Sequence, residues 1–263
     1  MSRCVSSPSP GHTMSAGRLL APLLAALLLL SGCLGLTSSD AGGPPSPQPV
    51  GDAEPFVVKG VVTTEAGEPV ANAEVWADNT LAYNSNALGS TDADGAYRIE
   101  LPRGDVTTWT MGGQVKIDYH GTTYTLGLEA DRAPFGSSEG AVRNLVLKVA
   151  GQWPQSNDSY WGATINIHQD YESETIELDT VELVMVPDGP LIDGSQGETI
   201  TYSLTGWEVV DIPIGRYTVS LRHTRPDGGE VDLRVRVRAS GDEFTPTVTA
   251  VAFELLELEF TTS

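Results

Sequence analysis

The sequence predicts an all-β protein of antiparallel β-sandwich type, with two sandwich modules in tandem. Apolar and polar residues alternate in one short run after another, for example around Tyr97, Ile99 and Leu101. A period of two places successive side chains on opposite faces of a strand. Clusters of Gly, Asp and Pro separate the runs, and we find no amphipathic helical pattern longer than two turns. Short strands at such spacing are typical of sandwiches.

Residues 1–32 are predicted to be a leader and signal peptide. Arg18 precedes an apolar run from Leu19 to Leu30, which is too short for a membrane-spanning helix of about 20 residues. A charged start, an apolar middle and a small-residue end form the anatomy of a signal peptide. Either Met1 or Met14 can be the true start, since residues 14–18 already form a compact basic segment.

The segment Leu30-Ser31-Gly32-Cys33 resembles the lipobox of bacterial lipoproteins, in which the cysteine is acylated and becomes the new N-terminus. The resemblance implies lipidation at Cys33 and anchoring to a membrane of the bacterial cell envelope, facing outward or into the periplasm. Stable anchoring takes more than one acyl chain. The alternative is a plain secretory signal with an incidental cysteine, and the sequence leaves open which membrane is used.

Residues 33–55 are predicted to form a disordered tether rich in Pro, Gly and Ser. Alternating prolines favour extended polyproline geometry, and glycines add slack. This composition cannot build a packed core. At about 3.1 Å per residue, roughly 20 such residues could hold a domain up to about 60 Å from a bilayer.

Charge and cysteine content exclude several classes of function. The formal net charge is −20, which repels nucleic acid and anionic membrane surfaces. The only cysteines are Cys4 and Cys33, so processing leaves no pair for a disulfide and no cysteine-based zinc site. We expect no cofactor and no nucleic-acid partner.

The first module, residues 56–151, carries a family resemblance. Gly60-Val61-Val62, then residues 67–75 (Gly-Glu-Pro-Val-Ala-Asn-Ala-Glu-Val), then residues 91–99 (Thr-Asp-Ala-Asp-Gly-Ala-Tyr-Arg-Ile) resemble the carboxypeptidase regulatory-like domain. That family has a transthyretin-like (prealbumin-like) sandwich and brings no catalytic residues. The resemblance implies a turn at Gly95, a buried Tyr97, and a carbohydrate-binding-like fold class.

The second module, residues 152–263, shows a faint echo of the first. Residues 101–107 (Leu-Pro-Arg-Gly-Asp-Val-Thr) align with residues 212–218 (Ile-Pro-Ile-Gly-Arg-Tyr-Thr). We therefore expect a second sandwich of the same or an Ig-like type, although a generic turn before a strand would give the same pattern. Near the C-terminus the apolar phase shifts by one residue, which predicts a β-bulge near Leu255-Leu256.

No catalytic or metal-binding pattern emerges. His120, His168 and His223 lack the spacing of a zinc site. The segment Asp92-Ala93-Asp94-Gly95 could open a calcium loop, but the distant bidentate acid is missing, so a turn is the favoured interpretation. We expect the alternating Arg234, Arg236 and Arg238 to form ion pairs with Glu254, Glu257 and Glu259 across the strands, or else an anion-binding patch.

The aromatic residues are predicted to be mostly core or interface residues, with a sugar-stacking platform as the alternative. The best loop candidate for a ligand site is Tyr83 with Asn84 and Asn86, which offers an aromatic face and amide groups. The sequence as a whole favours a surface-tethered, non-enzymatic binding or structural module, with a neutral glycan or an envelope protein as partner. The alternatives are an accessory subunit of an envelope hydrolase or transporter, and an uncharacterised hydrolase.

Overall fold

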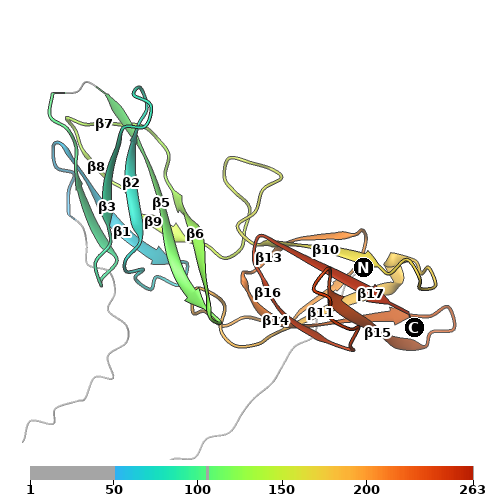
Figure 1. Cartoon of the computed structure of the whole chain (residues 1–263). Coiled ribbons are helices and arrows are strands. Elements are labelled where there is room, and N and C mark those ends of the chain that lie inside the picture. Colours follow the sequence, from blue (N-terminus) through green and yellow to red (C-terminus); the bar gives the residue numbers. More distant parts are fainter. Residues whose placement is uncertain (1–50, 105–106, 263) are drawn as a thin grey trace, which may run out of the picture. The chain divides into compact units, whose positions relative to one another are not determined.

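The structure, a computed structural model, describes residues 51–104 and 107–262. These residues form two β-sheets that follow one another along the chain (Figure 1), and the all-β prediction is confirmed. Within the described part, helical structure is confined to one 3-10 turn, Leu178–Thr180, and no helix there is long and apolar enough to cross a bilayer. The leader, Cys33 and the tether up to Val50 lie outside the described residues.

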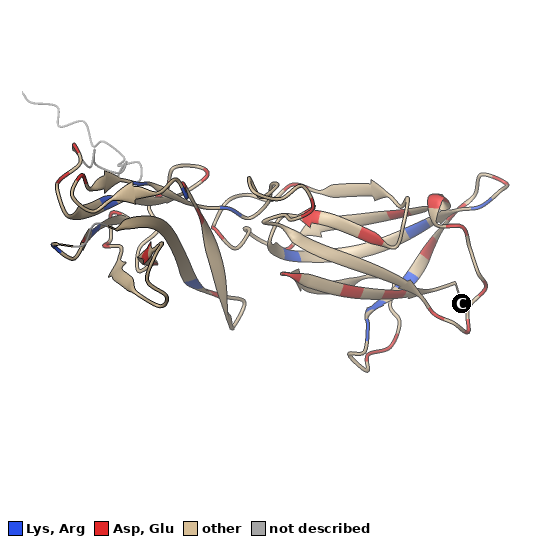
Figure 2. Cartoon of the chain, turned by 90° about the horizontal axis from the view of Figure 1, so that it is seen from above, with Lys and Arg blue, Asp and Glu red and all other residues tan. Residues whose placement is uncertain are grey.

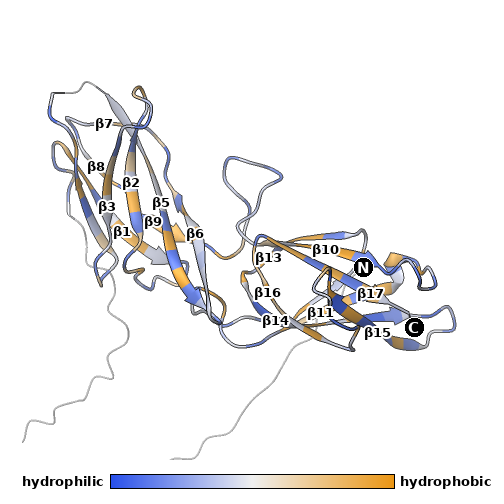
Figure 3. Cartoon of the chain, in the orientation of Figure 1, coloured by the Kyte–Doolittle hydropathy of each residue, from blue (hydrophilic) through white to orange (hydrophobic). Residues whose placement is uncertain are grey.

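The first sheet contains nine strands and has the order β3-β2-β5-β6-β9-β1-β4, with β7 paired to β5 and β8 paired to β1. Its strands are β1 (Val57–Thr64), β2 (Glu74–Asn79), β3 (Asn86–Ser90), β4 (Ala96–Glu100), β5 (Thr108–Tyr119), β6 (Thr122–Ala130), β7 (Phe135–Gly136), β8 (Ala141–Val142) and β9 (Leu145–Leu147). Apolar and polar residues alternate along strands such as β5 (Figure 3). The sheet therefore has one buried face and one solvated face.

The second sheet contains eight strands and has the order β12-β11-β14-β15-β17-β10-β13, with β16 paired to β14. Its strands are β10 (Ala163–Gln169), β11 (Val181–Pro187), β12 (Ile200–Ser203), β13 (Glu208–Ile212), β14 (Gly215–Thr224), β15 (Glu230–Val237), β16 (Val248–Ala252) and β17 (Leu255–Thr261). Acidic residues outnumber basic ones along these strands (Figure 2).

The two sheets share one topology. Strands β1 to β6 take the same places in the first sheet as β10 to β15 in the second, and β9 corresponds to β17. In both sheets the first and last strands of the common set pair in parallel, whereas the other pairs along the order are antiparallel. The echoing segments occupy equivalent places: residues 101–107 lie between β4 and β5, and residues 212–218 run from the last residue of β13 into the start of β14. The second sandwich therefore repeats the topology of the first.

The turn residues of the first sandwich have the mechanical roles that the family resemblance implied. Gly95 has φ +72, and a Cβ there would lie 2.5 Å from the carbonyl oxygen of Val62, so glycine is required. The Oδ1 atom of Asp92 accepts hydrogen bonds from the backbone N–H of Asp94 and Ala96. The predicted turn is therefore present at residues 92–95. Tyr97 is buried, as expected, and its hydroxyl donates to the backbone carbonyl of Arg143.

The core of the second sandwich comes from the strands whose apolar phase the sequence indicated. Ile165 and Ile167 of β10 and Leu258 of β17 are completely buried. Tyr217 of β14 is buried as well, and its hydroxyl donates to the carbonyl of Pro213 at 2.8 Å. The change of apolar phase was predicted near Leu255-Leu256, slightly too far along the chain. β16 ends at Ala252, the chain turns at Phe253 and Glu254, and β17 begins at Leu255.

This turn moves the chain from one neighbour to another. β16 pairs with β14, whereas β17 pairs with β10 and β15. Glu254 has φ +50, a left-handed conformation that is uncommon for a residue with a Cβ. The apolar phase changes here because the strand changes its partner, and not because a bulge interrupts a single ladder.

Candidate functional site

A compact loop that carries two tryptophans precedes β10. We call residues 151–162 the tryptophan loop. The backbone N–H of Trp161 donates to the carbonyl of Gly151 at 2.8 Å, and the N–H of Trp153 donates to the carbonyl of Ser159 at 2.9 Å. These bonds hold the two ends of the loop together, as in an Ω-loop.

Asp211 of β13 fixes the base of this loop. Its Oδ1 atom accepts the backbone N–H of Gly151 at 2.7 Å and that of Gly162 at 3.3 Å. Asp211 has φ +62, and the pairing of β10 with β13 shifts its register nearby, between Ala163 and Ile165. A bulge with a residue in an uncommon backbone conformation re-aims a side chain, and here the side chain is aimed at the loop.

Gly162 is required for this arrangement. A Cβ at position 162 would lie 2.7 Å from the carbonyl oxygen of Ile212 and 2.8 Å from backbone and side-chain atoms of Asp211. Distances this short would force the backbone apart. The absence of a side chain at Gly162 therefore lets the end of the tryptophan loop approach β13.

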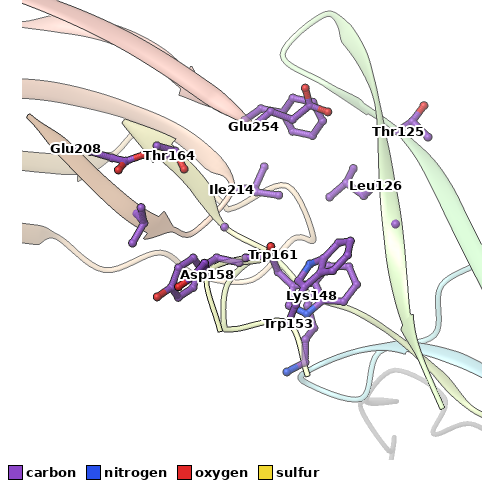
Figure 4. Close-up of a pocket in the computed structure, with 16 residues that line it drawn as sticks. Thr125, Leu126, Lys148, Trp153, Asp158, Trp161, Thr164, Glu208, Ile214 and Glu254 are labelled. Carbon is purple, nitrogen blue, oxygen red and sulfur yellow. The ribbon is translucent and has the colours of Figure 1, made fainter. Parts of the chain in front are cut away.

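The tryptophan loop forms one wall of a pocket with a volume of about 470 Å³. Figure 4 shows Thr125 and Leu126 on one side of the pocket and Thr164 and Glu208 on the other. The pocket is lined by Thr125, Leu126, Gly127, Lys148, Trp153, Asp158, Ser159, Tyr160, Trp161, Gly162, Thr164, Glu208, Val210, Ile214, Phe253 and Glu254. We call it the tryptophan pocket. It combines aromatic faces with hydroxyl, carboxylate and ammonium groups.

Trp153 and Trp161 lie next to one another in this wall. Their ring centroids are 5.0 Å apart and the rings are tilted by 40°. Trp153 remains 37% exposed. The Nε1 atom of Trp161 is buried and has no hydrogen-bond partner among the described residues. A buried donor without an acceptor costs about 1–3 kcal/mol, so this indole N–H is a group that a bound acceptor could satisfy.

The electrostatics of the pocket are dominated by carboxylates. Asp158, Glu208 and Glu254 line it, and its one basic residue is Lys148. The ammonium group of Lys148 lies 3.3 Å from a carboxylate oxygen of Glu65 and 3.4 Å from one of Glu129.

Burial alone would lower the pKa of Lys148, but the attraction of Glu129 and Glu65 outweighs it, so the pKa lies above its usual value. Lys148 is therefore charged but already neutralised by partners. The pocket as a whole favours neutral or cationic groups.

The structure places the sequence-predicted ligand residues elsewhere. Tyr83 is fully exposed on the turn between β2 and β3. Asn84 has φ +56, and Asn86 is the exposed first residue of β3. Tyr83 and Asn84 are thus adjacent on a protruding turn, and none of the three residues lines the tryptophan pocket. Their proposed role in glycan binding stays a prediction.

Two of the three alternating arginines form cross-strand ion pairs of the kind that the sequence suggested. Arg234 instead donates to the backbone carbonyl of Phe244, and Glu254 lines the tryptophan pocket. Arg236 lies 2.7 Å from Glu259, and Arg238 lies 3.4 Å from Glu257. The guanidinium group of Arg236 also covers the ring of Phe244 at 4.1 Å. These partners occupy the charges of Arg236 and Arg238, so an anion-binding patch is not favoured.

The three histidines of the described residues lie in separate surroundings. His223 contacts the hydroxyl of Thr180 at 2.8 Å, and His168 lies 3.4 Å from Glu257. His120 contacts Arg216 at 2.9 Å. Among residues 51–104 and 107–262, no group of three or more His, Cys, Asp and Glu side chains could hold a metal ion.

The sequence predicted a core or interface role for most aromatic residues, with a sugar-stacking platform as the alternative. It did not single out Trp153, Tyr160 and Trp161 as the wall of a pocket. The available signal was local: Trp153 and Trp161 bracket a short polar stretch between two runs of strand residues. Asp211 gave no signal, because its sequence surroundings are those of an ordinary strand.

Comparisons with known proteins do not identify a family for this chain. No family model matches the chain, and no curated protein matches it. Among solved structures, the Bacillus anthracis TIE protein is 14% identical with a TM-score of 0.35, over 78% of this chain and 34% of that one. The chain thus spans about a third of that protein's length.

A Streptococcal ancillary pilin is 12% identical with a TM-score of 0.25, over 78% of this chain and 69% of that one. At TM-scores below 0.5, neither likeness carries an argument about function. The resemblance of the first sandwich to carboxypeptidase regulatory-like domains stays an expectation from the sequence.

Proposed function

We propose that this protein is a lipid-tethered, non-enzymatic binding module of a bacterial cell envelope that holds a neutral saccharide in the tryptophan pocket. The observation that carries the proposal is the pair of adjacent indoles, Trp153 and Trp161, in the wall of a polar pocket. Sugar rings present apolar C–H faces that stack on aromatic rings, with hydroxyls that bond to polar groups at the rim. The pocket offers both kinds of contact.

The polar groups of the pocket suit hydroxyls and not anions. Carboxylates accept hydrogen bonds from sugar hydroxyls, and Asp158, Glu208 and Glu254 are available at the pocket wall. The same three charges repel uronic acids, sulfates and phosphates. The volume of about 470 Å³ falls within the usual range of small-ligand sites. The pocket therefore favours a neutral glycan.

The tethered part of the proposal rests on the sequence. Acylation at Cys33 would hold the chain at a membrane, and residues 34–55 would separate the sandwiches from the lipid surface. An acidic, tethered pair of sandwiches suits a protein that binds a ligand in the envelope or outside it. Membrane release of a Cys33→Ser variant would test this part separately from ligand binding.

The binding test is a titration of the purified full chain in detergent with neutral and acidic polysaccharides, followed by tryptophan fluorescence and calorimetry. Trp153→Ala should weaken binding of a neutral glycan at least tenfold. Trp207→Ala is the matched control, because Trp207 is 50% exposed and lies outside the pocket. Tyr83→Ala tests the alternative loop.

If Trp153→Ala and Trp207→Ala bind alike, the pocket is not the site. Loss of binding in Tyr83→Ala alone would transfer the site to the turn between β2 and β3. Turnover of any glycan or peptide in a substrate panel would contradict the non-enzymatic part of the proposal.

A further inference from the structure

The two sandwiches share one strand order, but they differ in how the two strands at the ends of that order pack against each other. In the first sandwich the end strands are β3 and β4, and Ile99 of β4 packs on Gly89 of β3. A Cβ on Gly89 would lie 2.7 Å from Cγ1 of Ile99. Because β3 and β4 pack against each other, side chains of the first sandwich fill the space between its two end strands.

In the second sandwich the equivalent end strands, β12 and β13, leave a groove open. It has a volume of about 620 Å³. It is lined by Leu191, Gln196, Gly197, Glu198, Thr199, Ile200, Thr201, Tyr202, Val209, Val210, Asp211, Ile212, Pro213 and Tyr217. Tyr202 is 38% exposed and Val210 is 41% exposed. The groove therefore presents apolar surface to solvent at the position where the first sandwich is packed shut.

The two edges of the groove differ in regularity. β12 pairs only with β11, in an uninterrupted register from Glu182↔Ser203 to Met185↔Ile200. Among the described residues it has no ladder partner on its other edge. β13 is interrupted at Asp211, and irregular edges resist pairing. An incoming strand would therefore add to β12.

The lining of the groove indicates the charge of its occupant. Glu198 and Asp211 are its charged residues, and no lysine or arginine lines it. A second copy of this chain would bring more negative charge to the same place, since the formal net charge is −20. A basic occupant from another protein is favoured over self-association.

We infer that the groove binds an extended, basic segment of a partner protein, which adds as a strand to the free edge of β12. Backbone hydrogen bonds to β12 give such a mode its affinity, and alternate side chains give it specificity. Alternate apolar side chains of the segment would enter the groove beside Ile200, Tyr202 and Val210. Basic side chains near one end would meet Glu198. This inference does not depend on the tryptophan pocket.

The test uses fluorescently labelled octapeptides and the full chain in detergent, measured by anisotropy. The probe is an alternating Val-Lys octapeptide. The controls are a peptide of the same composition with its lysines in one block, and an alternating peptide methylated at every backbone nitrogen. The alternating unmethylated peptide should bind at least tenfold more tightly than either control, because only it can form a two-faced strand with free N–H groups.

Variants locate the site. Tyr202→Lys and Glu198→Lys should each weaken binding of the alternating peptide at least fivefold. Tyr171→Lys adds the same charge at a residue that is 90% exposed and lies outside the groove, so it should change affinity less than twofold. Circular dichroism checks that the variants are folded.

Three results would overturn the inference. Equal binding of the alternating and block peptides would show general attraction of cations to an acidic protein. Equal effects of Tyr202→Lys and Tyr171→Lys would place the peptide elsewhere. Concentration-dependent dimers in sedimentation that Tyr202→Lys abolishes would show that a second copy takes the groove.

Discussion

Replacement of Asp211 by Ala should destabilise the protein by about 2–3 kcal/mol. The substitution removes the acceptor of two backbone N–H groups, at 2.7 Å from Gly151 and 3.3 Å from Gly162. A hydrogen bond to a charged acceptor contributes about 1.5–3 kcal/mol net, and we take the lower end because Asp211 is only half-buried. The longer bond contributes less. Alanine also tolerates a φ of +62 less well than aspartate does.

Two further variants separate the loss of the hydrogen bonds from the backbone strain. Asp211→Asn keeps a side-chain oxygen and a residue type that accepts the left-handed region, so its cost should be below about 1 kcal/mol. Asp211→Gly relieves the backbone but leaves both N–H groups without their acceptor, so its cost should lie between the other two. The order of stability should be wild type, Asn, Gly, Ala.

The assay is reversible unfolding in urea, with hydrogen exchange to locate the effect. For a chain of this size, 2–3 kcal/mol corresponds to a fall in melting temperature of about 4–12 °C. Exchange protection should fall first at the amides of Gly151 and Gly162. If Ala and Asn variants unfold at the same urea concentration as the wild type, Asp211 does not hold the tryptophan loop, and the reasoning about the loop is wrong.

Three other predictions concern the anchor and the two cores. Cys33→Ser should release the protein from the membrane fraction or trap it as precursor, and normal membrane retention would remove the lipoprotein interpretation. Gly95→Val should cost at least about 1–3 kcal/mol through backbone strain, measured by urea unfolding, and an unchanged midpoint would contradict the turn geometry. Burial raises the pKa of Tyr217 to about 12 and that of Tyr97 still further. The unfolded phenol titrates near 10. The stability from keeping these phenols neutral is therefore fully present below about pH 10 and is lost as the pH rises through 12. Tyr217→Phe should flatten this alkaline fall in the free energy of unfolding, and a slope equal to that of the wild type would show that the phenol stays accessible.

The fold was largely predictable because strand periodicity is a local property. Runs such as Ile165 with Ile167, and Leu183 with Met185, predicted buried faces that the structure contains. The strand order and the parallel pairing of first and last strands were not predictable, because pairing depends on residues far apart in sequence. The phase change before Leu255 was visible, but its cause, a change of partner strand, was not.

The candidate site was mostly beyond sequence reasoning. The tryptophan pocket joins Thr125, Trp161 and Glu254, and no local pattern links three such distant positions. The composition of the loop around Tyr83 predicted a ligand-binding loop, yet composition alone does not distinguish a protruding turn from a pocket wall. The left-handed conformation of Asp211 is set by a bulge, which the sequence of a single strand does not reveal.

The parallel pairing of first and last strands determines how each sandwich responds to a mechanical load. When the chain is pulled by its two ends, β10 and β17 are drawn in opposite directions along their shared axis. Their hydrogen bonds, in register from Thr164↔Leu255 to Gln169↔Phe260, then carry the force together in shear and do not open one at a time. The equivalent contact of β1 is divided into two shorter parallel ladders, with β8 at Val58↔Ala141 and Lys59↔Val142 and with β9 from Val62↔Leu145 to Thr64↔Leu147. Under tension the first sandwich should therefore yield before the second.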